Sequence, residues 1–150
     1  MNQPAIQFYL SQSAKDGGVK FTAPRVGDAG FDLPCAERVE VEPNSTKLIS
    51  TGLHLAIPLG WVGLIRDRSS VGSKGGLSLA GVVDASYRGE VRVAFHNLSA
   101  DKKVFEVGDR VAQIIFVQHL TGEHGFVECS DLEQLGQTSR GAAGFGSTGS

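Results

Sequence analysis

Apolar and polar residues alternate at every second position in several short stretches of the chain. The clearest are IQFYL at 6–10, RVEVEP at 38–43, LHLAIP at 53–58, EVRVAFHN at 90–97 and the more continuous RVAQIIFVQHL at 110–120. A period of two is typical of β-strands that bury one face. We therefore predict strands in these stretches.

Turn-forming pairs containing Pro, Gly, Asn or Asp separate the predicted strands, and no window shows a long apolar stripe with helical spacing. The one helix that the sequence indicates is short. It follows Arg68 in RSSVGSKGGL, where a serine can serve as the N-cap. Many short strands with almost no helix predict an all-β sandwich, barrel or jelly roll, which we place in one domain at residues 1–135.

The remaining residues, 136–150, end in RGAAGFGSTGS. A Gly- and Ser-rich terminus is usually a flexible remnant. The same segment also carries groups that suit a nucleotide: glycine amides can surround an anion, Arg140 can contact phosphate and Phe145 can stack on a base. Residue types alone therefore leave two readings, a remnant and a flexible arm that closes over a nucleotide.

Composition narrows the possible partners. The chain has 150 residues and a formal net charge of -2, which fits one globular domain and argues against binding a nucleic acid polymer by bulk charge. A single nucleotide needs no such basic excess. Cys35 and Cys129 lie far apart and match no zinc or disulfide pattern. The sequence shows neither a signal peptide nor a membrane span, so we expect an intracellular protein, cytoplasmic or nuclear.

One group of candidate site residues lies in GVVDASYRGEVRV at 81–93. Two β-branched runs around a tight connection predict a hairpin with Asp84 and Tyr87 at its turn. Closing the turn is the commonest use of an Asp at such a position, so Asp84 alone is an ambiguous signal.

Two further segments suit phosphate and metal chemistry. Arg68, Ser69 and Ser70 place a guanidinium and two hydroxyls at the start of the predicted helix, which suits an anion, although simple capping explains the serines as well. DAGFDL offers Asp28 and Asp32, and carboxylates near phosphate are a common way to hold magnesium.

Taken together, five segments resemble a known family. AGFDL, RSSVG, GVVDASYRGE, GDRVAQIIF and RGAAGFGSTG are similar to the five motifs, in order, of the trimeric deoxyuridine triphosphatases (dUTPases), and they extend from residue 29 to 149. Five matches in the correct order are far more specific than any one of them. The alternative readings of the single motifs lose most of their weight.

The resemblance implies a jelly-roll or β-clip type barrel, a homotrimer with shared active sites, and magnesium-dependent cleavage of dUTP to dUMP and pyrophosphate. That activity limits uracil incorporation into DNA and supplies dUMP for dTMP synthesis. Asp84 is implied as the residue that orients and deprotonates the attacking water, and Asp32 as a contact to Mg²⁺ through water. The implied substrate-binding residues are Arg68, Ser69, Ser70, Gly81, Val83, Tyr87, Gln113, Arg140, Phe145, Gly146 and Ser147.

The sequence departs from the family pattern at two positions. Ala143 stands where another glycine is usual, and Asp67 precedes Arg68 where proline is common. Two rival functions also remain at this point. One is a dCTP deaminase, or a bifunctional deaminase and diphosphatase, on the same fold, which the FGSTG ending disfavours. The other is a regulatory role in which the fold binds a protein partner and dUTP acts as a switch ligand.

Overall fold

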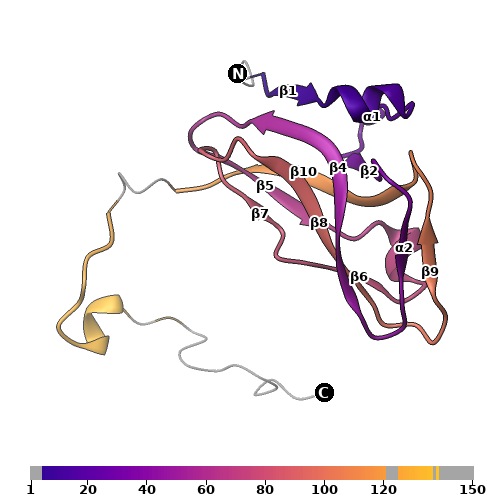
Figure 1. The fold of residues 1–150 in the computed structure, drawn as a ribbon. Helices are drawn as coiled ribbons and strands as arrows, with labels where there is room; N and C mark the ends of the chain where they lie inside the picture. Colours follow the sequence, from indigo (N-terminus) through magenta and orange to yellow (C-terminus); the bar gives the residue numbers. More distant parts are fainter. Residues whose placement is uncertain (1–4, 121–124, 137, 139–150) are drawn as a thin grey trace. The chain divides into compact units, whose positions relative to one another are not determined.

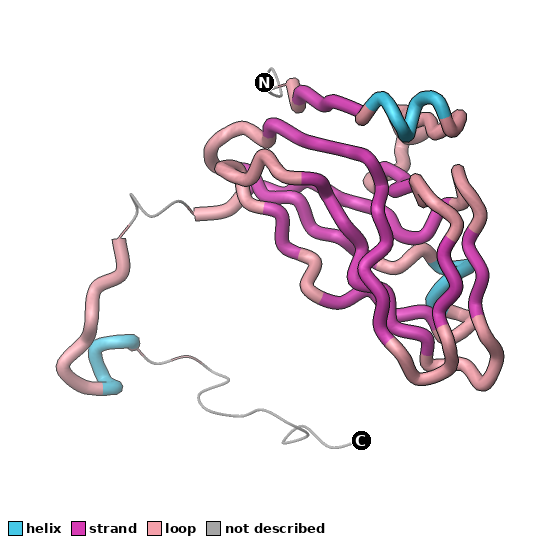
Figure 2. The backbone as a smooth tube through the Cα atoms, viewed as in Figure 1, coloured by secondary structure: helices cyan, strands magenta, loops and turns pink. Residues whose placement is uncertain are grey.

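The computed structural model describes residues 5–120, 125–136 and 138. The chain divides into two compact units, residues 1–120 and 121–150, and each is described by itself. Strands dominate the first unit (Figures 1 and 2). The second unit contains the 3-10 helix η2 (Leu132–Leu135), whose N-cap Asp131 accepts a hydrogen bond from the Gln134 amide. The division at residue 135 that the sequence suggested stays a prediction.

The strands of the first unit form three antiparallel sheets. The two larger sheets have the orders β1-β4-β8-β6 and β2-β10-β5-β7, and β3 pairs with β9. The strands are β1 (Gln7–Leu10), β2 (Phe31–Pro34), β3 (Val39–Val41), β4 (Thr46–Ala56), β5 (Trp61–Arg66), β6 (Gly76–Leu79), β7 (Val82–Val83), β8 (Glu90–Asn97), β9 (Lys103–Phe105) and β10 (Arg110–Gln118). The predicted all-β fold of jelly-roll type is confirmed.

The alternation of apolar and polar residues along the strands explains which side chains form the core. On β8 every second side chain from Val91 to Asn97 is buried, so Val93 and Phe95 face inward. The ring of Phe95 meets that of Phe105 edge to face, with 5.0 Å between centroids. The amide of Asn97 is buried as well, and it donates hydrogen bonds to the carbonyl oxygens of Val41 and Asp101. A satisfied polar group at this point ties β8 to β3 without an unpaired buried donor.

The helices differ from the sequence prediction in two respects. Helix α1 (Gln12–Asp16) was not predicted; Ser11 caps it by accepting a hydrogen bond from the Ala14 amide. Helix α2 (Ser69–Gly72) is present, but its N-cap is Arg68 rather than a serine, so the predicted cap is wrong. The backbone of Arg68 is still extended, which leaves both serines inside the helix. Among the described residues, no helix is long and apolar enough to cross a membrane.

The sequence predicted that the strands before and after Asp84 pair with each other as a hairpin, and this prediction is also wrong. β7 pairs with β5 in one sheet, whereas β8 pairs with β4 and β6 in the other. The segment between them is a turn in which the Tyr87 amide donates to the Asp84 carbonyl oxygen at 3.1 Å. Alternation predicts strands but not their partners, so the sequence could not show that this turn connects the two sheets.

The carboxylate of Glu90, at the start of β8, stabilises an irregularity in β4. The register of β4 against β8 shifts between Ser50 and Leu53. Glu90 accepts hydrogen bonds from the Ser50 hydroxyl and the Gly52 amide and forms an ion pair with Arg92 at 2.9 Å. Burial raises the pKa of Glu90, but these hydrogen bonds outweigh it and hold the pKa below its ordinary value.

Glu90→Gln is therefore expected to lower the free energy of unfolding at pH 7 and to have a much smaller effect at pH 3. The contribution of the ionised carboxylate is complete above the unfolded-state pKa, about 4.5, and is lost as the pH falls through the lower folded-state value. Urea unfolding of wild type and variant at both pH values, followed by Trp61 fluorescence, measures this difference. Glu37→Gln, at an exposed position, is the control. An equal loss at both pH values would show that ionisation of Glu90 contributes nothing.

Candidate active site

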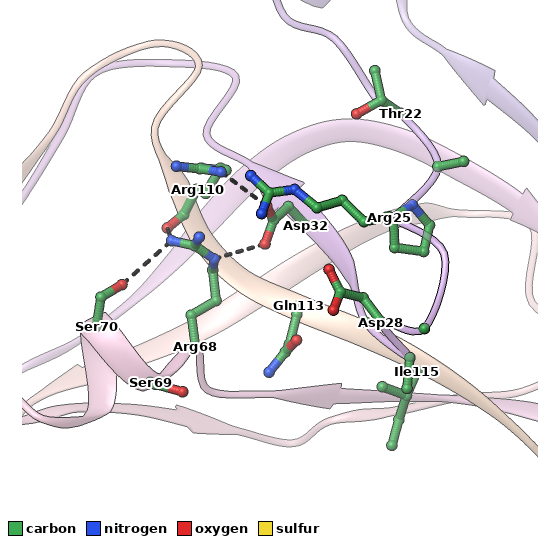
Figure 3. Close-up of a pocket in the computed structure, with 15 residues that line it drawn as sticks. Thr22, Arg25, Asp28, Asp32, Arg68, Ser69, Ser70, Arg110, Gln113 and Ile115 are labelled. Carbon is green, nitrogen blue, oxygen red and sulfur yellow. Dashed lines mark hydrogen bonds and ion pairs between the residues drawn. The ribbon is translucent and has the colours of Figure 1, made fainter.

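A pocket of about 880 Å³ opens on the first unit where β2, β10 and the end of β5 meet α2. Its lining includes five of the site residues that the resemblance implied: Asp32, Arg68, Ser69, Ser70 and Gln113. These residues come from three motifs that lie up to 81 positions apart in the chain. The fold therefore gathers the predicted phosphate-binding residues at one place (Figure 3).

Strand register explains this convergence. β10 lies between β2 and β5, and Gln113 pairs with Asp32 on one side and with Arg66 on the other. Arg68 follows two residues after Arg66, where the chain leaves β5 and enters α2. Side chains from all three strands thus project from the same end of the sheet.

An irregularity in β10 adds a residue that the sequence analysis did not single out. The register of β10 against β2 shifts between Arg110 and Ala112, and both Val111 and Ala112 are buried. Arg110 and Gln113 are three residues apart, so strict alternation would send them to opposite faces. With the shift, both line the pocket. In the sequence, Arg110 appears only as the basic residue of GDRVAQIIF. The face of the sheet to which its side chain points depends on the register shift.

Asp32 is the centre of an ion-pair network in the pocket. Its Oδ1 lies 2.6 Å from Nε of Arg68 and its Oδ2 lies 3.3 Å from Nη1 of Arg110. Arg68 also donates weakly to the Ser70 hydroxyl, at 3.4 Å. Figure 3 shows Asp32 between the two guanidinium groups. One carboxylate thus holds two arginines side by side, which leaves one positive charge of this cluster for an anion.

The segment before β2 forms the opposite wall of the pocket, including Arg25 and Asp28 (Figure 3). Aromatic contacts fix both ends of this segment. Phe21 stacks on Phe31 with 5.9 Å between ring centroids, and Phe31 meets Phe116 of β10 edge to face at 5.5 Å. The wall is therefore anchored to the core, although most of it has no regular secondary structure.

Gly30 allows this wall to approach β10 closely. A Cβ at Gly30 would overlap the side-chain oxygen of Gln113 and lie 2.9 Å from its Cδ. In the structure Gln113 donates a hydrogen bond of 2.9 Å to the carbonyl oxygen of Asp67. The glycine thus leaves room for the Gln113 amide, which links β10 to the segment that carries Arg68.

For the substrate that the resemblance implies, Gly30→Ala is expected to raise KM several-fold and to change kcat less, because the added methyl group must displace Gln113 from the pocket. Steady-state kinetics measure both constants. The control is a double-mutant cycle with Gln113→Ala: once that side chain is gone, the methyl group should cause little further loss. Additive losses from the two substitutions would contradict a clash with Gln113.

Asp67 stands where the resemblance would favour a proline, and hydrogen bonds hold both its side chain and its carbonyl group in place. Its Oδ1 accepts a hydrogen bond of 2.6 Å from the Ser78 amide on β6, and its carbonyl oxygen accepts the bond from Gln113. A proline would offer no such carboxylate to β6. The aspartate therefore joins the segment before α2 to the other large sheet, while Arg68 remains directed to Asp32.

Asp84 lies away from this pocket within the chain. Val83 pairs with Gly63, so Asp84 lies near the start of β5, whereas Arg68 follows its end. At about 3.3 Å per strand residue, the separation along β5 is roughly 13 Å or more. Asp84 is exposed, and neither it nor Gly81, Val83 or Tyr87 lines the pocket. One chain therefore does not bring all the predicted residues together.

The turn after β7 presents an ordered surface of its own. The Tyr87 hydroxyl donates to the Glu90 carbonyl oxygen at 3.0 Å, and the ring lies so close to Gly89 that a Cβ there would be 2.5 Å from Cζ. Tyr87 is 47% exposed, so its ring is held and still accessible. The side chain of Val83 is 7% exposed and belongs to the core, so the backbone is the part of this residue that a ligand could contact.

The other predicted residues, Arg140, Phe145, Gly146 and Ser147, lie outside the described residues, as does Ala143. Within the described part of the chain, no group of three or more His, Cys, Asp or Glu side chains could hold a metal ion by itself. The pocket does offer the oxygen donors of Asp32 and Asp28. Mg²⁺ commonly takes one or two carboxylates together with substrate phosphates and water, and this donor set fits that arrangement.

Comparisons with known proteins agree with the fold and the motifs. The sequence matches the dUTPase family over residues 19–149. The deoxyuridine 5'-triphosphate nucleotidohydrolase of Wolinella succinogenes is 44% identical over 126 residues, covering 82% of this chain and 81% of the relative. The protein of that name from Corynebacterium diphtheriae is 43% identical over 127 residues, covering 82% of this chain and 80% of the relative.

Solved structures give the same result. The dUTPase of Staphylococcus bacteriophage 80alpha with dUpNHpp has a TM-score of 0.85 at 26% identity and covers 99% of this chain and 100% of that chain. A mutant dUTPase from phage phi11 of S. aureus, described for its coordination of a structural Mg(II) ion, has a TM-score of 0.75 at 25% identity, with coverage of 87% and 99%. The family match spans most of the sequence and includes all five motifs, and we conclude that the chain belongs to the dUTPase family.

Proposed function

We propose that the chain hydrolyses dUTP to dUMP and pyrophosphate by in-line attack, on the α-phosphorus, of a water molecule that Asp84 orients and deprotonates. The names of the relatives support dUTP hydrolysis. The observation that carries the proposal for this chain is the pocket in which Asp32 holds Arg68 and Arg110 beside Ser69, Ser70 and Gln113.

The pocket suits the phosphate chain. A triphosphate repels an incoming nucleophile, so cationic groups must offset its charge before water can attack. Arg68 and Arg110 are held in place by Asp32 and therefore need little rearrangement to accept phosphate oxygens. Ser69 and Ser70 add hydroxyl donors, and Gln113 supports the segment from which they project. Arg140 would contribute a further guanidinium when the C-terminal arm closes.

Magnesium fits the same pocket, where Asp32 would contact it through water and the triphosphate would hold it directly. Bound there, the ion would offset phosphate charge and help to orient the leaving group. Asp32 remains paired with Arg68 and Arg110 in this arrangement, which suits a contact through water better than direct coordination.

Asp84 suits the role of general base. It follows directly after β7 on a turn that a backbone hydrogen bond closes, and its carboxylate is exposed and thus accessible to a water molecule. In-line attack requires that the water be positioned and lose a proton as the new bond to phosphorus forms. A carboxylate on a rigid turn can do both.

The same turn suits the nucleoside. In the described residues β7 pairs with β5 along one edge, which leaves backbone groups on its other edge for the base. Uracil and cytosine reverse the donor and acceptor pattern on their pairing edge, so backbone groups from Gly81 to Val83 can distinguish them. Tyr87 would lie beneath the sugar and clash with a ribose 2'-hydroxyl, while Phe145, Gly146 and Ser147 would close over the base and phosphates.

A homotrimer with shared sites accounts for the distance between the phosphate pocket and Asp84. If each site takes its pocket, its Asp84 turn and its arm from different subunits, residues that lie apart in one chain meet at the subunit boundaries. The roughly 13 Å along β5 estimated from strand spacing supports this arrangement, because no small side-chain movement spans it.

Mixing two inactive variants tests the shared site. Asp84→Asn with an intact arm and a truncation after Ser139 with an intact turn are unfolded and refolded together in equal amounts. If turn and arm of one site belong to different subunits, about a quarter of sites receive both intact parts, and activity should recover to about a quarter of wild type. No recovery, with mixed trimers shown by mass spectrometry, would place both parts on one chain.

Pyrophosphate release from dUTP, dTTP, dCTP and UTP, assayed in parallel, tests the function itself. Only dUTP should be cleaved efficiently. Ammonia release from dCTP would indicate a deaminase instead. In a cell, the activity would limit uracil incorporation into DNA and supply dUMP for dTMP synthesis, and the two free cysteines in the described residues are consistent with the reducing, intracellular location that we expect.

A regulatory role is a second candidate, because phage dUTPases such as that of Staphylococcus bacteriophage 80alpha control transfer of virulence genes by a proto-oncogenic G protein-like mechanism. For this chain such a role would require a protein partner whose binding depends on dUTP. Pull-down from a cell lysate with and without a non-hydrolysable dUTP analogue tests it, and nucleotide-independent capture would count against a switch.

A further inference from the structure

A second pocket, of about 430 Å³, adjoins the phosphate pocket. The two pockets share Arg68, Ser70 and Arg110 as lining residues. Beyond this common wall, the second pocket lies between α2 and β9, and Lys74 and Lys103 line it. An anion bound at the shared arginines could therefore contact side chains of either pocket.

The second pocket carries a surplus of positive charge. Four cationic side chains line it, against the carboxylate of Asp109 and that of Asp32 on the far side of the arginines. Asp109 already accepts a hydrogen bond from the Glu106 amide. Even with both carboxylates counted, two positive charges remain, so the pocket favours an anion.

Of the four cations that line this pocket, Lys74 and Lys103 are the two without an ion-pair partner among the described residues. In the part of the chain that the structure describes, no carboxylate lies within ion-pair distance of either lysine, although five other basic side chains have such partners. Lys103 is half-buried, and the described residues give its ammonium group no counter-charge. A bound anion would supply that charge.

The floor of the pocket is rigid. Phe95 is fully buried and meets Phe105 edge to face, and both rings line the pocket together with Val71. Because the lining combines apolar side chains with four cationic ones, the charge of the ligand is the feature that this pocket can recognise. The pocket thus suits a small inorganic polyanion that cations can approach from several sides.

We propose that this second pocket receives pyrophosphate, the leaving group of the proposed reaction, on its way from the phosphate pocket to solvent. The proposal rests on the proposed function for the source of the pyrophosphate. Bond cleavage at the α-phosphorus frees pyrophosphate beside Arg68 and Arg110, and Lys74 and Lys103 draw it to the side away from the nucleoside. dUMP carries less charge and competes weakly for the lysines.

The test measures binding of inorganic pyrophosphate alone, by calorimetry, to the full chain and to the double variant Lys74→Gln, Lys103→Gln. We expect the dissociation constant to rise by about tenfold or more, since each lysine contributes a charge-assisted contact. The KM for dUTP and the binding of dUMP should change less than twofold. The matched control is Lys47→Gln, a lysine of β4 that lines neither pocket.

A second variant tests the same pocket by adding a negative charge instead of removing positive ones. Val104→Glu places a carboxylate on β9 next to Lys103, at an exposed residue that lines the pocket, and it should weaken pyrophosphate binding as well. An unchanged dissociation constant in both variants would overturn the proposal. An equal loss of affinity for a non-hydrolysable dUTP analogue would also overturn it, because the lysines would then contact the substrate itself. Because calorimetry measures pyrophosphate binding directly, these results do not depend on whether the protein hydrolyses dUTP.

Discussion

Asp84→Asn is expected to lower kcat for dUTP by about 10²- to 10⁴-fold, the range typical of a lost general base. Asparagine keeps the shape of the side chain and the turn that the Tyr87 amide closes, but it cannot accept the proton of the attacking water. Nucleotide binding should therefore remain close to wild type. Steady-state kinetics together with calorimetry of a non-hydrolysable dUTP analogue separate the two effects.

A matched control excludes a general loss of negative charge. Asp101→Asn changes another exposed aspartate, in the turn after β8, whose backbone oxygen accepts hydrogen bonds from the side chains of Asn97 and Ser99. It should leave kcat unchanged. An Asp84→Asn enzyme that turned over dUTP at the wild-type rate would show that another group takes the proton.

Truncation after Ser139 is expected to remove nearly all turnover, by about 10³-fold, the lower end of the range for an arginine supplied to phosphoryl transfer. The strand-rich unit ends at residue 120 and has its own core, so far-ultraviolet circular dichroism and the unfolding midpoint should be unchanged. Phe145→Trp in the full-length chain should report closure as a change in fluorescence when a non-hydrolysable dUTP analogue binds. Loss of folding on truncation would show that the segment is structural.

Alternation was sufficient to predict strands where one face is buried. It identified β8 and β10, because Val91, Val93 and Phe95 recur at every second position and face the core. It did not predict α1, a five-residue helix that Ser11 caps, because one turn and a half is too short to show a helical period. It also could not give the partners of β7 and β8, since partner choice depends on packing between sheets.

The candidate site was predicted in part, and the prediction rested mainly on the five motifs in their order along the chain. Asp32, Arg68 and Gln113 meet in one pocket as the resemblance implied. Arg110 was not singled out, because only the register shift in β10 turns it to the same side as Gln113. The distance between Asp84 and the pocket could not be predicted either, because it depends on which end of β5 each segment meets.

The register shift at Arg110 also bears on how this chain can change over time or be redesigned. A deletion of one residue between Arg110 and Ala112 would restore a regular ladder, and it would turn Arg110 away from Asp32 without altering any active-site residue. Insertions in exposed turns would leave the pocket intact. Sequence comparisons that permit gaps in β10 would therefore misjudge whether a chain keeps this pocket. Grafting the site onto another scaffold requires that both the number of residues in β10 and their side chains be preserved.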